Sequence, residues 1–206
     1  MKVGLGTGHA AMAFVSALAG RVSQGLTVVC VPTSEATRRR AQSLDLCLTT
    51  LAEIGELDLT IDGADEVDPR LDLIKGLGGA LVREKIVAAS SKRLMIVVGA
   101  EKIVERLGVR TPLPVEIVPF GLALCERRLA ALGAHAVLRK TSEGPFLSDN
   151  GNYILDCGFG GIDDPSATER AIRSIPGVVD TGLFIGMAER VLVQEGSVVR
   201  VRERVS

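Results

Sequence analysis

The chain has 206 residues, of which 24 are basic and 25 are acidic, so its formal net charge is -1. Hydrophobic residues make up 47% and charged residues 24%, which is typical of a folded globular protein and excludes a disordered or fibrous chain. Near-zero charge and an aromatic content of 3% argue against nucleic-acid binding, because that function calls for a basic face and stacking platforms.

The first half of the chain predicts strands that alternate with helices. Strands are expected at 2–5, 26–31, 57–61 and 93–98, and helices at 10–19, 35–43 and 79–89. This alternation favours an α/β fold, a Rossmann-like parallel sheet with helices on both faces. Ligands of such sheets bind beyond the carboxyl ends of the strands, so the residues that follow each strand are the first candidates for a site.

The rhythm changes after Pro114. Strands are expected at 115–118, 134–139 and 178–183, helices at 121–132 and 165–174, and a hairpin over 146–157 that turns at Asn150-Gly151. The order β-α-β-β-α-β predicts a smaller ferredoxin-like α+β domain. A last hairpin, 190–194 with 197–202, can rejoin the first sheet. We therefore expect a Rossmann-like catalytic domain at 1–107 and 191–206, and a ferredoxin-like domain at 108–190.

The four cysteines, at positions 30, 47, 125 and 157, lack the spacing of a metal site or a redox pair. Cys30, Cys47 and Cys157 lie in apolar runs, where a reduced thiol acts as a small hydrophobic group, and this favours a cytoplasmic location. The apolar start of the chain imitates a signal peptide, but the glycines at 4–8 predict a strand and turn instead. No apolar run is long enough to predict a membrane span.

A glycine turn joins the first strand to the first helix, with the sequence GLGTGHAA at 4–11. Glycines let the backbone approach an anion, the helix start offers N–H groups, and Thr7 adds a hydroxyl. The turn also satisfies a loose dinucleotide-binding pattern with Glu35 as a ribose partner. A tight turn that only packs the strand on the helix is the structural alternative.

An acidic motif, DGADEVD at 62–68, follows the third strand. Like charges so close together do not all ionise freely, and this favours a role in proton transfer for Asp62 and Asp65. A metal site is one alternative, although the spacing lacks the glycine and distal glutamate of a calcium loop. A solvated acidic turn is the other alternative.

A lysine–glycine loop, KGLGG at 75–79, leads into the helix that carries Glu84. The helix dipole keeps a carboxyl group near the helix start ionised, which makes Glu84 a workable general base, while a surface or capping glutamate is the structural alternative. Lys102 follows the fourth strand and can supply a positive charge to a phosphate, or it is a surface lysine. His9 can donate to the same anion.

The combination of motifs resembles ribose-5-phosphate isomerase, type A, over nearly the whole chain. The matching segments are 4–8 (GLGTG), 62–66 (DGADE), 75–78 (KGLG), 83–86 (REKI), 112–116 (PLPVE), 148–152 (SDNGN) and 175–179 (IPGVV). The resemblance implies interconversion of ribose 5-phosphate and ribulose 5-phosphate in the pentose phosphate pathway, without metal or organic cofactor. It also implies a homodimer or homotetramer.

The resemblance assigns the proton-transferring glutamate to Glu84. It assigns substrate contacts to Thr7, Gly8, His9 and Ala10, to Asp62, Gly63, Ala64 and Asp65, to Lys75, Gly76, Leu77 and Gly78, and to Lys102. Moving a proton between C2 and C1 through an enediolate needs one carboxylate base, partners for the sugar oxygens and a cation near the oxyanion. In this scheme Glu84 is the base, Asp62 and Asp65 exchange protons with the oxygens, and Lys75 stabilises the negative charge.

The sequence departs from the family pattern in three places. The chain begins at the first strand, where the family usually has a preceding helix, so exposed apolar surface or a lost contact near the phosphate is expected. His9 and Ala10 replace two hydroxyl residues of the usual loop, and Leu77 stands where some members have glycine. These departures leave open a sugar-phosphate-binding module with little or no catalysis. A nicotinamide-dependent oxidoreductase is a third interpretation, which rests on Gly6, Gly8, Ala11 and Glu35.

Overall fold

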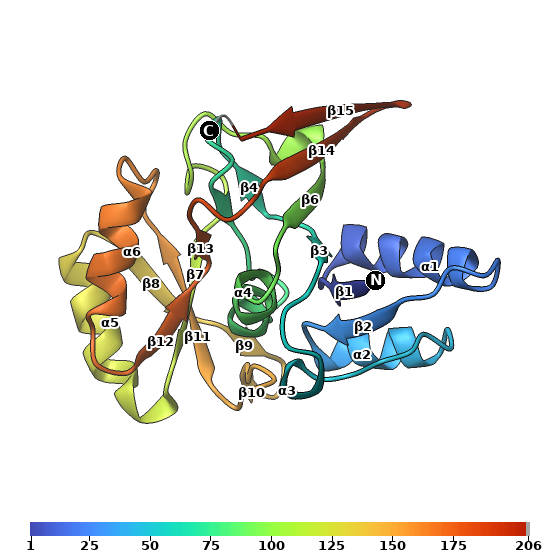
Figure 1. Cartoon of the computed structure of the whole chain (residues 1–206). Coiled ribbons are helices and arrows are strands. Elements are labelled where there is room, and N and C mark those ends of the chain that lie inside the picture. The colour runs from blue at the N-terminus through green and yellow to red at the C-terminus, as the bar shows by residue number, and fades with distance from the viewer. Residues whose placement is uncertain (205–206) are drawn as a thin grey trace. The chain divides into compact units, whose positions relative to one another are not determined.

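The computed structural model describes residues 1–204, and the chain divides into two compact units (Figure 1). The first unit holds Met1–Ala64, Arg83–Glu101 and the C-terminal segment from Met187. The second unit holds Asp65–Val82 and Lys102–Gly186. The domain limits expected from the sequence, 1–107 with 191–206 and 108–190, stay a prediction.

A six-stranded sheet forms the centre of the first unit. In spatial order its strands are β15 (Val198–Glu203), β14 (Arg190–Glu195), β6 (Leu94–Gly99), β3 (Leu59–Asp62), β1 (Lys2–Leu5) and β2 (Val29–Pro32). All neighbouring pairs are parallel except β14 with β15. The predicted parallel sheet is therefore confirmed, and so is the final hairpin, because β14 pairs with β6 (Figure 1).

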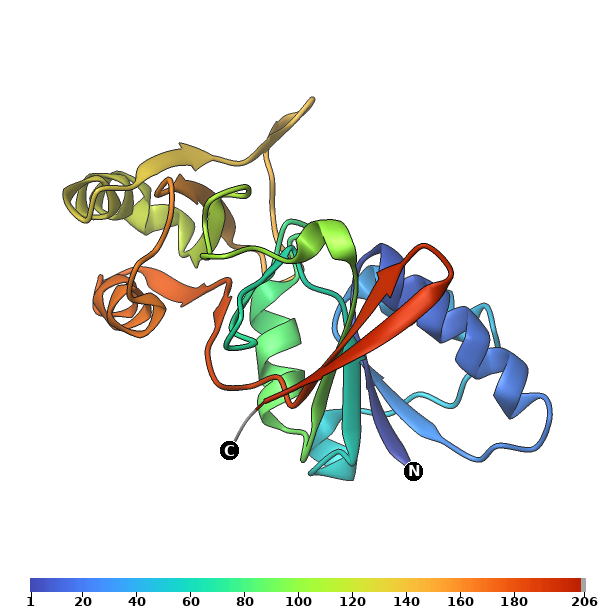
Figure 2. The same cartoon turned by 90° about the horizontal axis from the view of Figure 1, so that it is seen from above.

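Helices cover both faces of this sheet, as predicted. They are α1 (His9–Val22), α2 (Glu35–Gln42), α3 (Leu51–Ile54) and α4 (Leu81–Ala89), with a 3-10 turn η1 (Ala100–Lys102) after β6. Successive residues of a strand point to opposite faces. Accordingly Cys30 packs in a cluster with residues of α1 and α2, whereas Val31 packs against Val87 of α4. Figure 2 shows α1 and α4 on opposite sides of the strands.

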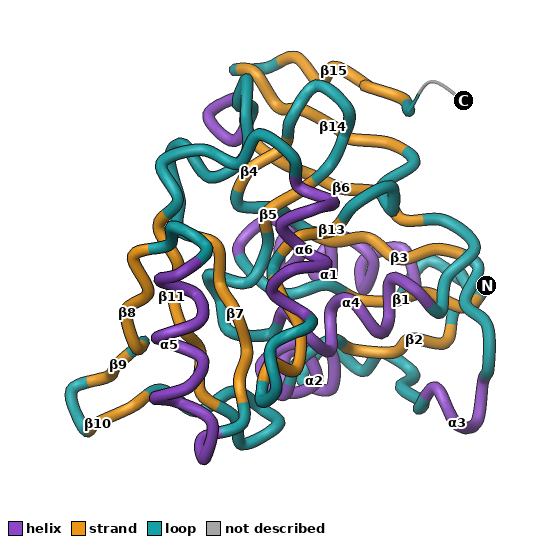
Figure 3. The backbone as a smooth tube through the Cα atoms, turned by 90° about the vertical axis from the view of Figure 1, so that its left-hand side faces the viewer, coloured by secondary structure: helices purple, strands orange, loops and turns teal. Residues whose placement is uncertain are grey.

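The main sheet of the second unit is antiparallel and has the order β12-β7-β11-β8. Its elements in chain order are β7 (Leu113–Ile117), η2 (Pro119–Gly121), α5 (Leu122–Ala131), β8 (His135–Leu138), β11 (Tyr153–Gly158), α6 (Pro165–Arg173) and β12 (Val178–Thr181) (Figure 3). This is the predicted β-α-β-β-α-β order, with the first and third strands in the middle of the sheet. Asp164 starts α6, because its side chain accepts the N–H of Ala167 at 2.9 Å.

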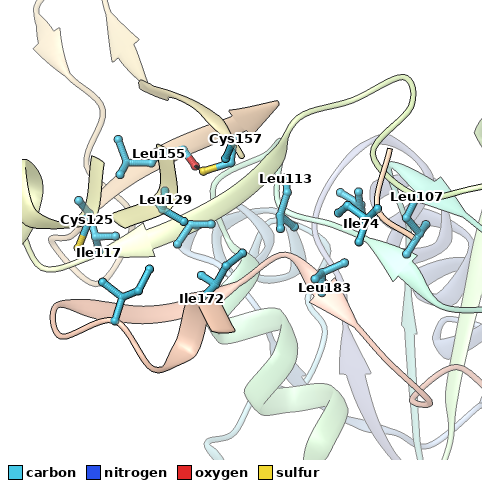
Figure 4. Packing of buried hydrophobic residues seen from close by; sticks show 14 of the residues in the cluster. Ile74, Leu107, Leu113, Ile117, Cys125, Leu129, Leu155, Cys157, Ile172 and Leu183 are labelled. Atoms are coloured by element: carbon cyan, nitrogen blue, oxygen red, sulfur yellow. Dashed lines mark hydrogen bonds between the residues drawn. The ribbon is translucent and has the colours of Figure 1, made fainter. Parts of the chain in front are cut away.

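The core of the second unit lies between this sheet and its two helices (Figure 4). Leu113, Val115 and Ile117 alternate along β7 and point into it. Leu129 of α5 and Ile172 of α6 pack against them, and all five side chains are buried. The period of two along β7 is the reason that its intervening residues, including Glu116, face the other side of the sheet.

The hairpin expected over 146–157 is only partly present. The turn exists, since the N–H of Gly151 donates to the carbonyl of Ser148 and Gly151 has φ 77°. The prediction of a strand before the turn is wrong, because β11, the strand after the turn, pairs with β7 and β8 instead. Three side chains of this segment, those of Ser148, Asn150 and Asn152, donate to Oε1 of the buried Glu116. The segment therefore folds around a carboxylate, and a small hairpin of β9 (Lys140–Thr141) and β10 (Gly144–Pro145) precedes it.

The second unit also contains a small antiparallel sheet that the sequence did not predict. It joins β4 (Glu66–Val67), β5 (Leu73–Ile74) and β13 (Leu183–Phe184) in the order β13-β5-β4. Each strand has only two residues, which is too short for any hydrophobic periodicity to be seen. β4 contains Glu66 of the acidic motif and β5 ends just before the lysine–glycine loop, so their pairing holds these two segments next to each other.

Three of the four cysteines are buried, namely Cys30, Cys125 and Cys157. Burial raises the pKa of the Cys30 thiol to about 11 and that of the Cys157 thiol to about 12. Cys47 is exposed, so its interpretation as a buried small hydrophobic residue is wrong. Within residues 1–204, no helix combines the length and the apolar character that crossing a membrane requires.

Candidate active site

The strand order of the first sheet defines where a ligand would bind in the first unit. The chain passes from β1 to β2 on one side and then returns to β3 on the other side of β1. In open α/β sheets the ligand lies at such a switch point, beyond the carboxyl ends of the strands. The glycine turn after β1 and Asp62 at the end of β3 meet there.

Asp62 and the glycine turn are held together by short contacts. The carboxylate Oδ1 of Asp62 accepts the backbone N–H of Thr7 at 3.0 Å and of Gly63 at 2.7 Å, and the residue is buried. The turn needs glycine at position 6, because a Cβ there would lie 2.1 Å from Oδ1 and 2.6 Å from Cα of Asp62. These contacts fix the orientation of a carboxylate at the switch point.

The hydroxyl of Thr7 lies within a cluster of hydroxyl groups. Its Oγ1 lies 2.8 Å from Thr33 Oγ1, donates to Ser34 Oγ at 2.7 Å and lies 3.1 Å from Thr37 Oγ1. The hydroxyl of Thr37 in turn donates to the carbonyl of Gly6 at 2.9 Å. These four hydroxyl residues, Thr7, Thr33, Ser34 and Thr37, form a hydroxyl cluster that stabilises the glycine turn. Ser34 also caps α2, because its Oγ accepts the N–H of Thr37 at 3.1 Å.

The start of α1 can receive an anion. Gly8 precedes the helix with φ 97°, and a Cβ at this position would meet nothing within 4 Å. His9 is exposed and Ala10 is half-buried, so this first turn lies at the surface of the unit. Orphan N–H groups at a helix start bind phosphate readily, which agrees with the predicted use of this turn.

Glu84 lies in the first turn of α4 and is only 4% exposed. The positive end of the helix dipole favours the ionised form of a carboxyl group at this position. The preceding residue, Arg83, forms an ion pair with Glu35 at 3.2 Å, and Glu35 also pairs with Arg38 at 2.7 Å. Hydrogen bonds from Arg38 and then Arg83 lower the pKa of the Glu35 carboxyl. These two arginines therefore occupy the carboxylate of Glu35, the residue that the oxidoreductase alternative required for ribose.

In the second unit, the small sheet places Asp65 and Lys75 side by side. β4 and β5 are antiparallel with Glu66 opposite Ile74, so the residue before β4 lies opposite the residue after β5. The N–H of Asp65 donates to the carbonyl of Ile74 at 2.8 Å. The ammonium of Lys75 lies 5.4 Å from the ring centroid of Phe184, and Lys75 is only 2% exposed. A lysine so desolvated is suited to stabilise negative charge.

The lysine–glycine loop, residues 75–79, folds tightly beside these residues. Its N–H at Leu77 donates to Asp65 Oδ2 at 3.0 Å. Gly76 and Gly79 have φ 106° and 82°, and a Cβ at either position would lie 2.8 Å from Leu81 or 2.5 Å from Phe146, respectively. The glycines are therefore required both by conformation and by space.

Two of the four carboxylates in the acidic motif have structural roles. Glu66 is fully buried and accepts the N–H groups of Gly108, Arg110 and Thr111 at 2.6 to 2.8 Å. Asp68 is also buried and its Oδ1 accepts two backbone N–H groups at 2.9 Å. The motif is therefore not a solvated acidic turn. Among the described residues, no group of three or more His, Cys, Asp or Glu is arranged to hold a metal ion.

The contacts thus join Thr7 to Asp62 in the first unit, and Asp65 to Ile74 and Leu77 in the second. Glu84 belongs to the first unit, while Lys102 ends η1 as a half-buried residue of the second. In the first unit, an oriented carboxylate can exchange a proton with a hydroxyl group and the N–H-rich turn can hold an anion. In the second unit, a buried ammonium can stabilise an oxyanion.

The chain is similar in sequence to known proteins over most of its length. Residues 29–197 match the sequence profile of the family described as Ribose 5-phosphate isomerase A (phosphoriboisomerase A). The chain is 57% identical over 196 residues to the ribose-5-phosphate isomerase A of Gloeobacter violaceus, covering 95% of this chain and 85% of that protein. It is 56% identical over 196 residues to the enzyme of that name from Roseiflexus castenholzii, covering 94% of this chain and 84% of that protein.

Solved structures agree with the sequence relatives. Ribose 5-phosphate isomerase A from Methanocaldococcus jannaschii matches with a TM-score of 0.94 and 39% identity, covering 98% of this chain and 91% of that chain. A D-ribose-5-phosphate isomerase in complex with phospho-erythronic acid matches with a TM-score of 0.97 and 36% identity, covering 99% of this chain and 91% of that chain.

Proposed function

The chain belongs to the ribose 5-phosphate isomerase A family and interconverts ribose 5-phosphate and ribulose 5-phosphate, and we propose that Glu84 is the base of this reaction. The observation that carries the proposal is a buried glutamate in the first turn of α4, where the helix dipole favours its ionised form. A carboxylate near the positive end of a helix is a workable general base for a carbon acid.

The reaction needs one proton to leave C2 and to arrive at C1. In the direction from the aldose, the carboxylate of Glu84 removes the proton from C2 of the open-chain sugar, and the electron pair shifts to give the enediolate. The same carboxyl group then returns the proton to C1. A proton must also move from the C2 hydroxyl and another must reach the oxygen at C1, so two further groups are needed at the oxygens.

Asp62 and Asp65 supply the oxygen partners in this proposal, and they also assist ring opening. Backbone N–H groups orient each carboxylate, two on Asp62 and that of Leu77 on Asp65. Lys75, buried beside Phe184, stabilises the negative charge on the oxygens of the enediolate. Each of these groups acts on an oxygen, and Glu84 acts on carbon.

The phosphate is held by backbone groups in this proposal. The N–H groups at Gly8, His9 and Ala10 take the place of the two hydroxyls that the family usually provides, because His9 and Ala10 stand where those hydroxyl residues would be. Lys102 adds positive charge. The relative that was solved with phospho-erythronic acid binds a phosphorylated sugar acid, which supports a sugar-phosphate site in this chain.

Two further expectations belong to the proposal. We expect a homodimer or homotetramer, and the fully exposed ring of Phe120 is one apolar group that a second copy could cover. Light scattering at several concentrations measures the mass and would refute self-association if it found a monomer throughout. We also place the enzyme in the cytoplasm, in keeping with four free cysteines and a sugar-phosphate substrate.

Turnover of purified variants tests the assignment of the base. Glu84→Gln should lower kcat by about 100- to 10,000-fold, the usual contribution of a general base, with EDTA present throughout. Glu53→Gln is the matched control, since Glu53 also lies in the first turn of a helix of the first unit, α3. A Glu84→Gln enzyme with near-normal turnover would move the base to Asp62 or Asp65. Binding of ribose 5-phosphate by a folded native chain without turnover would instead favour a binding module.

A further inference from the structure

Arg139 follows β8 in the second unit and is anchored by a carboxylate. Its Nε donates to Asp156 Oδ2 at 2.9 Å, and its Nη2 donates to Asp156 Oδ1, so the pair is bidentate. The side chain of Arg139 is only 13% exposed. A planar guanidinium bound on two nitrogens has one terminal nitrogen left to direct elsewhere, and its direction is fixed.

That third nitrogen reaches the lysine–glycine loop. Nη1 of Arg139 donates to the carbonyl of Gly76 at 3.1 Å and to the carbonyl of Leu77 at 3.0 Å. The guanidinium also stacks over the ring of Phe146, 5.7 Å from its centroid. The same ring packs where a side chain at Gly79 would have to go. Arg139 and Phe146 therefore hold the loop from its carbonyl side.

The peptide group between Gly76 and Leu77 is bound at both ends. Its carbonyl accepts from the guanidinium of Arg139, and its N–H donates to the carboxylate of Asp65 at 3.0 Å. In a trans peptide the C=O and N–H point in opposite directions, so a cation at one end and an anion at the other polarise it in the same sense. Asp156, Arg139, this peptide and Asp65 thus form one continuous chain of hydrogen bonds.

We propose that Arg139 is a positioning residue for the isomerase reaction, acting through the Gly76–Leu77 peptide to fix the carboxylate of Asp65. The inference rests on the proposed role of Asp65 at the sugar oxygens. A carboxylate that exchanges protons with substrate must hold one orientation, and the polarised N–H at Leu77 provides it. Lysine is a poor substitute, since one ammonium cannot bind Asp156 at two points and the two carbonyls as well.

Steady-state kinetics of Arg139→Gln, Arg139→Lys and Asp156→Asn provides the first test. Because misplacing a reacting group by about 1 Å costs roughly 100-fold in rate, Arg139→Gln should lower kcat by about 10- to 100-fold with a smaller change in KM. Arg139→Lys and Asp156→Asn should show the same split to a lesser degree. Arg106→Gln is the matched control, because Arg106 pairs with Asp163 in the same unit.

A double-mutant cycle separates positioning of Asp65 from general support of the fold. If Arg139 acts through Asp65, then Arg139→Gln should change kcat much less in an Asp65→Asn background than in the native chain. Additive losses would overturn the inference, as would a native-like kcat in Arg139→Gln. If Asp65→Asn alone is fully active, the proposed role of Asp65 fails and the inference about Arg139 fails with it. This outcome differs from additive losses, which would overturn the inference about Arg139 alone.

Amide hydrogen exchange supplies a readout that does not depend on catalysis. The Leu77 amide should exchange at least about tenfold faster in Arg139→Gln and Arg139→Lys than in the native chain, because its carboxylate partner is no longer held in line. The amide of Leu155 in β11 serves as the internal reference. Unchanged protection of Leu77 in both folded variants would show that Arg139 does not set this peptide.

Discussion

Replacing Glu66 by glutamine should destabilise the second unit much more than a Glu→Gln change at an exposed position of the same unit. Glu66 is fully buried, and its two oxygens accept three backbone N–H groups from residues 108–111. Glutamine keeps one oxygen, which can still serve Arg110 and Thr111. Its NH₂ group would then face the N–H of Gly108, so two donors meet and one buried N–H loses its partner.

The size of the effect follows from these three bonds. A hydrogen bond to a charged group contributes about 1.5–3 kcal/mol, and a buried donor left without a partner costs about 1–3 kcal/mol. Losing one bond, weakening two and burying an unpaired donor should cost about 3–5 kcal/mol in the free energy of unfolding. For a chain of this length, that corresponds to a fall in Tm of roughly 10 °C.

Thermal and urea unfolding of Glu66→Gln measures the loss, with Glu143→Gln as the control because Glu143 lies exposed in the turn between β9 and β10. Turnover of the folded variant at low temperature should remain within a few-fold of the native rate. An unchanged Tm would refute the structural role of Glu66. A large loss of kcat with native stability would instead place Glu66 at the substrate.

Three further outcomes follow from the first unit and the cysteines. Gly6→Ala should lower both stability and kcat, because the added Cβ would lie 2.1 Å from Asp62 Oδ1. Thermal unfolding and turnover measure the two effects, and native values of both Tm and kcat would contradict the prediction. Under native conditions a thiol reagent should label Cys47 much faster than the three buried cysteines, because burial raises the thiol pKa of Cys30 to about 11 and of Cys157 to about 12. Mass spectrometry of the labelled protein measures the rate at each cysteine, and equal rates would contradict this prediction. Glu35→Gln should destabilise the protein above pH 4.5 and have less effect at lower pH. Because hydrogen bonds from Arg38 and Arg83 lower the pKa of Glu35 in the folded state below its ordinary value of 4.5, its stabilisation is present above that value and lost as the pH falls through the folded pKa. Urea unfolding at several pH values should show the difference from native shrinking below 4.5, and a constant difference would argue against the linkage.

The sequence was sufficient for those parts of the fold that rest on long periodic segments. The alternation of strands and helices predicted the parallel sheet, and the β14–β15 hairpin was predicted to rejoin it. It was not sufficient where two-residue strands decide the structure. Nothing in the pattern of 65–75 shows that Asp65 and Lys75 flank the same end of a sheet, because β4 and β5, whose pairing brings them together, have only two residues each.

The candidate site shows the same division. Motifs and resemblance found Glu84, Asp62, Asp65 and Lys75, whose assignments remain predictions. They could not distinguish the structural carboxylate of Glu66 from that of its neighbour Asp65, because only the structure shows that Glu66 accepts three backbone N–H groups. Nor could they find Arg139, because its contacts with the lysine–glycine loop cross 62 and 63 positions of the chain. Such partners become visible only when the fold is known.

The central claim is that the carboxylate of Glu84 carries the proton between C2 and C1. The most direct measurement follows the loss of label from ribose 5-phosphate deuterated at C2, by NMR, in the native enzyme and in Glu84→Gln. The native enzyme should release or transfer the deuterium during turnover. Glu84→Gln should bind ribose 5-phosphate by calorimetry with native-like affinity and leave the label at C2. Loss of the label at a native rate in Glu84→Gln would contradict the account.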